Sequence, residues 1–203
     1  MSAHSYHHGN LRAALLEAGL ELIREVGPKG FTIREVARRA GVSHNAPYRH
    51  FQDKDELIAA IANEGFERLA GAMKQSAAAG TTGIDRLQLC GASYVEFALR
   101  WPGHFLAMFD SSNVANDHFK EEIAGENAFQ TLLGFIVESQ NEGSFPAGDP
   151  HPSAYLAWSL VHGIAKLAVN GQFPYTSKQV LDFTREASAM LVRGMSLGTR
   201  PAV

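Results

Sequence analysis

The sequence predicts an all-α protein with a small N-terminal domain followed by a larger helical domain. Apolar residues recur at the three-to-four spacing of amphipathic helices along most of the chain, and no segment shows the alternation of a half-buried strand. The chain has 203 residues, of which 45% are hydrophobic. This is enough for a sizeable core and for roughly one or two domains.

Two short helices are expected near the N-terminus. The first covers residues 11–26 and ends before Gly27 and Pro28. The apolar residues on its buried face are Leu11, Leu15, Ala18, Leu22 and Val26. The second begins after Thr32, because Thr32 and Glu35 have the spacing of a capping box. It is barely two turns long, and its buried face holds Ile33, Val36, Ala37 and Ala40.

A tight turn then leads to a third short helix. Gly41 supplies the left-handed residue that a sharp turn needs, and Ser43 is the expected N-cap. Pro47 is tolerated in the first helical turn, so the regular helix is expected to start about one or two residues later than the cap indicates. Two short helices joined by a glycine turn form the helix-turn-helix pattern, whose second helix enters the major groove of DNA.

The side chains of this motif can be sorted by the DNA group that they would contact. His44, Asn45 and Arg49 are candidates for base edges, since Asn pairs with adenine and Arg with guanine through two hydrogen bonds each. Ala46 and Pro47 are also candidate DNA contacts, and the Pro47 ring offers an apolar surface to a thymine methyl. The candidates for phosphate contacts are Thr32, Arg34, Ser43, Tyr48, His50 and Lys54. The alternative is that each polar residue is simply solvated.

The charge of the chain is distributed unevenly. Residues 1–54 hold eight Lys and Arg against five Asp and Glu, a net charge of +3, whereas the remainder holds ten against sixteen, a net charge of −6. Such a split is expected if the N-terminal quarter meets a polyanion, although solvated helical faces produce similar local excesses.

A long helix is expected from its N-cap at Asp53 to about Met73, leading out of a DNA-binding domain of residues 1–56 into a second domain of residues 57–203. Small residues predict a loop over 76–83. Further helices are expected over about 85–100, 103–110, 117–142, 152–170 and 177–197.

The last two helices predict an interface between two copies of the chain. Helix 152–170 is apolar nearly all round, which is typical of a helix buried on two sides. Helix 177–197 carries two apolar stripes, one of Val180, Thr184, Ala187, Leu191 and Gly194, the other of Phe183, Met190 and Leu197. Together they predict a homodimer, whose two recognition helices about 34 Å apart would read a palindromic operator in double-stranded DNA. The alternative is a thick monomeric core.

Aromatic residues concentrate in the middle of the chain and predict an apolar cavity. The candidate ligand-binding residues are Tyr94, Phe97, Phe105, Met108, Phe109, Phe129, Trp158 and His162. Trp158 and His162 are one helical turn apart. The alternative for each residue is ordinary core packing, and His162 could instead donate to a buried carbonyl.

The runs FTIREVARRAGVS at residues 31–43, YRHF at 48–51 and KDEL at 54–57 resemble the DNA-binding domain of the tetracycline-repressor-like (TetR) family of transcriptional regulators. YHHGNLR at 6–12 and WSLVHG at 158–163 resemble a subgroup whose C-terminal domain bears a Trp-x3-His-Gly (WHG) signature. The resemblance implies a homodimeric repressor that a small, largely apolar ligand releases from its operator. It also implies that the ligand tilts the long helix and changes the spacing of the recognition helices.

The sequence predicts neither an enzyme nor a cofactor. It holds no GxSxG, HExxH, phosphate-loop or dinucleotide motif, and its one cysteine, Cys90, is expected to be a small core residue. His7 and His8 are only a weak metal signal. No signal peptide or membrane-spanning stretch is found, so a cytoplasmic protein without a membrane partner is expected. Two alternatives stay open: a DNA-binding dimer without an effector, and a helical enzyme that uses Cys90 or the region of His162.

Overall fold

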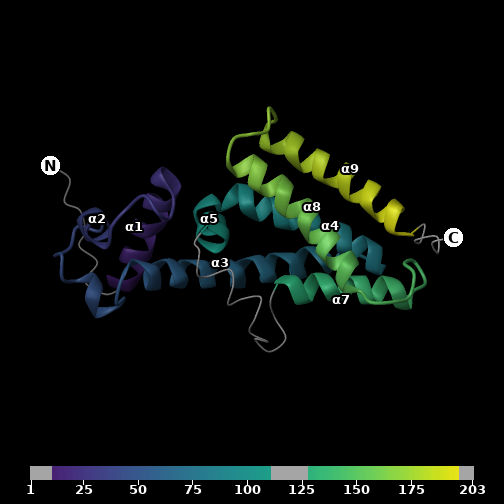
Figure 1. Ribbon diagram of the computed structural model, residues 1–203, viewed down its shortest axis with the longest axis horizontal. Coiled ribbons are helices and arrows are strands. Elements are labelled where there is room, and N and C mark those ends of the chain that lie inside the picture. Colours follow the sequence, from purple (N-terminus) through teal and green to yellow (C-terminus); the bar gives the residue numbers. More distant parts are fainter. Residues whose placement is uncertain (1–10, 111–127, 197–203) are drawn as a thin grey trace. The chain divides into compact units, whose positions relative to one another are not determined.

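The computed structural model describes residues 11–110 and 128–196, and every regular element in these two ranges is a helix (Figure 1). In chain order they are α1 (Leu11–Val26), α2 (Ile33–Arg39), the 3-10 turn η1 (Pro47–Arg49), α3 (Lys54–Ala77), α4 (Gly83–Arg100), α5 (Pro102–Asp110), α7 (Ala128–Asn141), α8 (His151–Val169) and α9 (Ser177–Ser196). The all-α prediction is confirmed.

The helices form two compact units. The first contains the described residues up to Gly65 together with residues 103–110, and the second contains Phe66–Pro102 together with residues 128–196. Helix α3 contributes to both units, because the division falls between Gly65 and Phe66. The boundary expected after residue 56, between the DNA-binding domain and the second domain, lies nine residues before this division in the same helix and remains a prediction.

Helix α3 starts as predicted and ends later than predicted. Asp53 caps it by accepting a hydrogen bond from the N–H of Glu56 at 2.9 Å. The helix then continues to Ala77, into the stretch that was expected to be a loop. Alanine is the best helix former, and this run is rich in alanine until Gly80. The prediction of a loop from residue 76 is therefore wrong at its start.

The other helix boundaries agree with the sequence-based expectation. Helix α1 covers the expected residues, and the ends of α4, α5, α8 and α9 lie within about two residues of the expected ones. Of the helix expected over 117–142, α7 accounts for Ala128–Asn141. Residues 117–127 lie outside the described residues.

The core of the first unit is built from α1, α2, α3 and α5. Its most deeply buried side chains include Leu15, Ile23, Val36, Leu57, Ile61, Phe105 and Met108. Helices α1 and α3 approach at Gly19, where a Cβ atom would lie 3.0 Å from side-chain atoms of Leu57 and Ile61. Helices α3 and α5 approach at Gly65, where a Cβ atom would lie 2.6 Å from the Sδ atom of Met108. Glycine at these two positions permits the short helix–helix distances.

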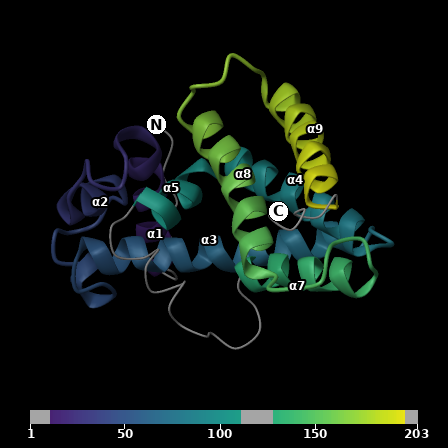
Figure 2. The ribbon, with the colours of Figure 1, turned by 45° about the vertical axis from the view of Figure 1, so that its right-hand side comes forward.

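Helix α4 is central to the second unit and contacts α7, α8 and α9 (Figure 2). Its N-terminus is fixed to α7, because the N–H of Gly83 donates to Glu142 Oε2 at 2.8 Å and Arg86 pairs with Glu138. A Cβ atom at Gly83 would lie 2.6 Å from the backbone nitrogen of the buried Ser139. Only glycine allows so close a contact between the two helices.

Helices α8 and α9 each bury one face in the second unit and expose apolar side chains on the other. On α9 the buried residues are four apart: Val180, Thr184, Ser188 and Val192. The predicted stripe that ended at Gly194 is therefore displaced, since Gly194 is exposed. The large apolar side chains exposed on the two helices are Tyr155, Leu156, Leu167, Phe183 and Met190. The second predicted stripe, with Phe183 and Met190, is confirmed as an apolar surface, and Leu197 lies outside the described residues.

Candidate DNA interface and effector pocket

Helix α2 begins with a capping box. The N–H of Thr32 donates to Glu35 Oε2 at 2.7 Å, and the N–H of Glu35 donates to Thr32 Oγ1 at 3.3 Å. The hydrogen bonds from the Thr32 backbone and hydroxyl lower the pKa of Glu35 below its ordinary value. The predicted box is confirmed. The Thr32 hydroxyl, which was expected to hold a phosphate, donates to Glu35 at 3.0 Å and is thus engaged within the cap.

The turn after α2 has the geometry of a Schellman motif. Gly41 has a φ angle of 68°, and its N–H donates to the carbonyl of Arg38 at 3.2 Å. The N–H of Val42 donates to the carbonyl of Ala37 at 3.0 Å. The left-handed residue predicted at Gly41 is confirmed, two residues after α2 ends at Arg39.

The third element of the motif is a single 3-10 turn, η1, and not the short helix capped by Ser43 that the sequence predicts. The residue before η1 is Ala46, whose side chain makes no capping hydrogen bond. Ser43 contributes its backbone carbonyl, which accepts from the N–H of Ala46 at 2.9 Å. Pro47 explains the difference, because it has no N–H with which to continue a preceding helical turn. The element starts late, as expected from Pro47, but three residues later than a cap at Ser43 indicates and not one or two, and the cap expected at Ser43 is wrong.

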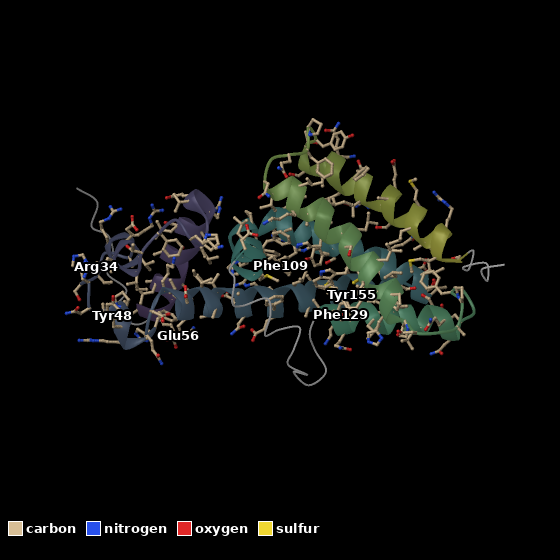
Figure 3. All side chains as sticks on the ribbon, in the orientation of Figure 1. Arg34, Tyr48, Glu56, Phe109, Phe129 and Tyr155 are labelled. Carbon is tan, nitrogen blue, oxygen red and sulfur yellow. The ribbon has the colours of Figure 1, made fainter. Side chains whose placement is uncertain are left out.

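Most side chains predicted to contact DNA are exposed. Tyr48 has 51% of its surface exposed, and Figure 3 shows it with Arg34 at one end of the first unit. Pro47 is buried, so its ring is not presented to a thymine methyl as predicted. Lys54 is half-buried, with Nζ 5.5 Å from the centre of the Phe31 ring. The exposed candidates are Thr32, Arg34, Ser43, His44, Asn45, Tyr48, Arg49 and His50, and Ala46 is half-buried.

Sequence reasoning missed Arg38 as a candidate DNA contact. Arg38 lies four residues after Arg34, and both are exposed on α2, so helix geometry places them on the same face. This spacing is visible in the sequence and could have identified the pair. The neighbouring Arg39 serves a different purpose: its Nη2 donates to Glu25 Oε2 at 2.7 Å and its Nη1 to Glu21 Oε2 at 3.3 Å. These bonds tie α2 to α1, and the Arg39 guanidinium lowers the pKa of Glu25.

A pocket lies inside the second unit, between α4, α7, α8, α9 and the last part of α3. About 420 Å³ of it is free of atoms, including space open to solvent, but the centre of a water molecule can reach only about 20 Å³. Its apolar lining includes Met73, Leu87, Ala157, Trp158, Val161 and Leu191, and its polar side chains are those of Gln88, Tyr94 and Ser188. Space of this size holds about one water molecule, so a larger ligand requires lining side chains to move.

A row of aromatic rings starts at this pocket. The Tyr94 oxygen lies 2.9 Å from Nδ1 of His162, and the Tyr94 ring meets Trp158 edge-on, with ring centres 5.1 Å apart. Trp158 contacts Phe129 at 5.9 Å between ring centres, and Phe129 contacts Tyr155 at 5.0 Å (Figure 3). Tyr94 is 1% exposed and Tyr155 is 56% exposed. The row therefore leads from the buried core of the second unit to its surface.

Two titratable groups in the pocket wall are held neutral by burial. Burial raises the pKa of the Cys90 thiol to about 12 and raises the pKa of the Tyr94 phenol well above its ordinary value. The expectation that Cys90 is a small core residue is confirmed, because it is 1% exposed. A thiol protonated at neutral pH is a poor nucleophile.

The structure brings together only part of the predicted ligand-binding set, namely Tyr94, Phe129, Trp158 and His162. Phe97 is buried beside Trp101, with ring centres 5.4 Å apart. Phe105, Met108 and Phe109 belong to the first unit, where the rings of Phe105 and Phe109 lie 5.1 Å apart. Their assignment to the same cavity as Tyr94 is not supported. Aromatic content alone cannot reveal that two consecutive apolar helices, α4 and α5, join different cores.

The described part of the chain shows neither a metal-binding cluster nor a helix able to span a membrane. No group of three His, Cys, Asp or Glu side chains in residues 11–110 and 128–196 is arranged to hold a metal ion. No helix in those ranges combines the length and hydropathy needed to cross a membrane. His7 and His8 lie outside them.

Two family models match the chain. Residues 15–61 match the model described as bacterial regulatory proteins of the tetR family, and residues 87–191 match the tetracyclin repressor-like C-terminal domain. Curated relatives match over a shorter region. An HTH-type transcriptional repressor from Mycobacterium tuberculosis and an HTH-type transcriptional regulator from Mycobacterium bovis are each 43% identical over 49 residues. This region is 24% of the present chain and about a quarter, 26%, of each relative.

Solved structures resemble the chain over most of its length. A Rhodococcus sp. RHA1 protein of unknown function is 30% identical with a TM-score of 0.74, and the match covers 96% of this chain and 100% of that one. FadR from Bacillus subtilis, solved in complex with stearoyl-CoA, is 17% identical with a TM-score of 0.74, over 90% of this chain and 98% of its own. PfmR from Thermus thermophilus is a TetR family regulator, 16% identical with a TM-score of 0.71, over 88% of this chain and 97% of its own.

The matched models fall on the structural features already described. The first covers the capped α2, the Gly41 turn and η1, and the second covers most of the helices that surround the pocket. The second model alone accounts for more than half of the chain. The chain therefore belongs to the TetR family of bacterial transcriptional regulators.

Proposed function

We propose that this chain acts in the cytoplasm as a homodimeric, sequence-specific repressor that leaves its DNA operator when a small, largely apolar ligand binds. The observation that carries the proposal is the capped α2 and left-handed Gly41 turn, which hold the exposed cations of Arg34, Arg38 and Arg49 in one small unit. Contacts between such cations and phosphates supply most of the affinity of a protein for DNA. The M. tuberculosis relative, named a repressor, supports the direction of control.

The proposed contacts divide into those that position the protein and those that read the sequence. Arg34, Arg38 and the hydroxyl of Tyr48 hold phosphates. Arg49 and Asn45 read base edges, because their side chains form paired hydrogen bonds with guanine and adenine. His44 and His50 are exposed beside them and complete the surface.

The exposed faces of α8 and α9 support the homodimer. Met190 is 65% exposed, Tyr155 56% and Leu156 51%. Apolar side chains gathered on adjacent helices mark an association surface, and a two-fold dimer is the commonest closed assembly. Pairing would place two copies of η1 against successive major-groove faces of a palindromic operator. The residues Trp158, His162 and Gly163 support the assignment of the second unit to the WHG subgroup.

The pocket supports control by a small molecule. It is largely apolar, as ligand sites usually are, and FadR of B. subtilis, which shares the fold, was solved with stearoyl-CoA. In the proposed mechanism the ligand spreads the helices around the pocket, shifts α3, and changes the distance between the two copies of η1 in the dimer. No catalytic step is part of the proposal.

The size of the pocket favours a second candidate, a DNA-binding dimer without an effector. Space for about one water molecule does not by itself bind a signal molecule. The two candidates share the DNA interface and differ only in whether a ligand can open the pocket.

Fluorescence anisotropy tests the DNA function. The full chain is titrated with duplexes from upstream of its own coding region and with random duplex, at several salt concentrations. We expect salt-dependent binding that prefers an operator by a factor of about a thousand or more. The variant Arg49→Ala should lose about 1–3 kcal/mol of operator binding, while Arg100→Ala, an exposed arginine of the second unit, should bind as the wild type does. Indiscriminate binding, together with failure of a genome-wide selection to enrich any fragment, would contradict the proposal.

A further inference from the structure

We propose that the pocket of the second unit accepts an uncharged ligand, an apolar molecule whose polar group is a hydroxyl or carbonyl, and excludes ionised carboxylic acids. This inference rests on the proposed effector control and narrows the class of effector. It follows from the charge of the pocket wall and from its size.

The described part of the pocket wall carries no charged side chain, since none of the residues that line it is Asp, Glu, Lys or Arg. Its polar side-chain groups are the amide of Gln88, the phenol of Tyr94, the hydroxyl of Ser188, the thiol of Cys90 and the indole N–H of Trp158. These neutral groups donate and accept hydrogen bonds, which satisfies a ligand hydroxyl or carbonyl. An ionised carboxylate needs an opposite charge as well, because the cost of removing it from water is far larger.

The titratable groups of the pocket wall show the same cost of removing an anion from water. The Cys90 thiol and the Tyr94 phenol both have raised pKa values because burial disfavours their anions. A ligand carboxylate at this place would lose its hydration in the same way. The imidazole of His162 has its Nδ1 2.9 Å from the Tyr94 phenol oxygen, and His162 is not among the residues that line the pocket.

The dimensions of the pocket favour a small ligand. The space that the centre of a water molecule can reach is about that of one water molecule, and the wall around it includes Gly91 and Ala157. Trp158 forms part of the wall and belongs to the row of rings that leads from Tyr94 to the exposed Tyr155. A short alcohol or a benzyl group needs less displacement of this wall than a long chain does.

Two matched pairs of probes test the inference on the full chain: hexanol with hexanoate, and benzyl alcohol with benzoate. At about pH 8 both acids are fully ionised and a histidine with an ordinary pKa is neutral. Thermal shift measures ligand binding without any need for DNA. Fluorescence anisotropy, with the operator duplex that the protein prefers in the DNA titration, measures release of the protein from DNA. We expect each alcohol to raise Tm and release DNA, and its acid to bind at least about tenfold more weakly.

A change of charge in the wall should reverse this preference. Gln88→Lys places an ammonium in the lining, so hexanoate should gain affinity and hexanol should lose it. The matched control is Gln130→Lys, which adds the same charge at an exposed position on α7 and should keep the preference of the wild type. Circular dichroism establishes that both variants are folded, and if Gln88→Lys is not, the comparison of alcohols with acids on the wild type decides alone.

The possible results separate the two proposals. Acids that bind the wild type as well as the alcohols do would overturn the uncharged-ligand inference and leave effector control standing. A folded Gln88→Lys variant with unchanged preference would place the ligand outside this pocket and overturn the inference as well. If neither member of either pair shifts Tm, both the inference and effector control fail, while DNA binding is judged by its own titration.

Discussion

Replacing Gly41 with alanine tests the turn that joins α2 to η1. The φ angle of Gly41 is +68°, and no atom lies within 4 Å of the position that a Cβ atom would occupy. Alanine therefore meets no neighbour, and its whole cost is the left-handed backbone, about 1–2 kcal/mol. Alanine also has less freedom than glycine in the unfolded chain, which offsets about 0.4–1 kcal/mol. The net effect is a loss of about 1 kcal/mol of folding free energy.

The matched control is the same substitution at Gly71. This residue is exposed in α3, has no positive φ angle and has nothing within 4 Å of its Cβ position. Alanine in a helix interior is more stable than glycine by about 0.5–1 kcal/mol, so Gly71→Ala should raise Tm. For a chain of this size 1 kcal/mol corresponds to about 2–4 °C. Calorimetry should therefore show shifts of opposite sign for the two variants.

The operator affinity of the same variants provides a second readout. Because the Gly41 turn sets the orientation of η1 relative to α2, Gly41→Ala should weaken DNA binding, whereas Gly71→Ala should leave it unchanged. A Gly41→Ala variant that melts at or above the wild-type temperature would refute the left-handed turn and the reasoning that depends on it.

Three further results are expected. At pH values above the ordinary pKa of the Glu25 carboxyl, Arg39→Ala should lower Tm, because the ion pair with Arg39 depresses that pKa in the folded state. In melting curves, the difference in Tm from wild type should disappear as the pH falls through the depressed pKa. A difference in Tm that is the same at every pH would argue against the ion pair. Arg34→Ala and Arg38→Ala should each weaken binding to all duplexes and reduce the slope of log K against log salt by about one in anisotropy titrations, whereas a loss confined to the operator would assign the residue to a base. Met190→Glu should convert the proposed dimer to monomer in sedimentation velocity, and an unchanged dimer would place the interface elsewhere.

Local signals in the sequence were sufficient where one residue type determines the backbone. Thr32 and Glu35 indicated the start of α2, and Gly41 indicated its end, because a capping box and a left-handed residue depend on neighbours within a few positions. The apolar period likewise predicted the long helices. It also indicated the second apolar stripe of α9 through Phe183 and Met190.

The rest depended on contacts between distant residues. Nothing local distinguishes a Pro47 ring that faces DNA from one that is buried, and the structure buries it. The sequence also could not show which of the two cores Phe105 and Met108 join. Their place in the first unit depends on the close contact of Met108 with Gly65, a residue that is distant in the sequence. Arg38 was overlooked although its spacing from Arg34 was available.

The first unit is discontinuous in the sequence, because α5 belongs to it although α4, which precedes α5 in the chain, belongs to the second unit. A fragment cut after Gly65 would lack Met108, which packs on Gly65, and Gly103, which lies against Leu20 of α1. The division between the units also falls inside an unbroken helix, which gives a protease no loop to cut there. We therefore expect helix-turn-helix fragments that end before α5 to be poorly folded, so that a biosensor or a gene switch made from this protein would have to carry the chain at least through α5.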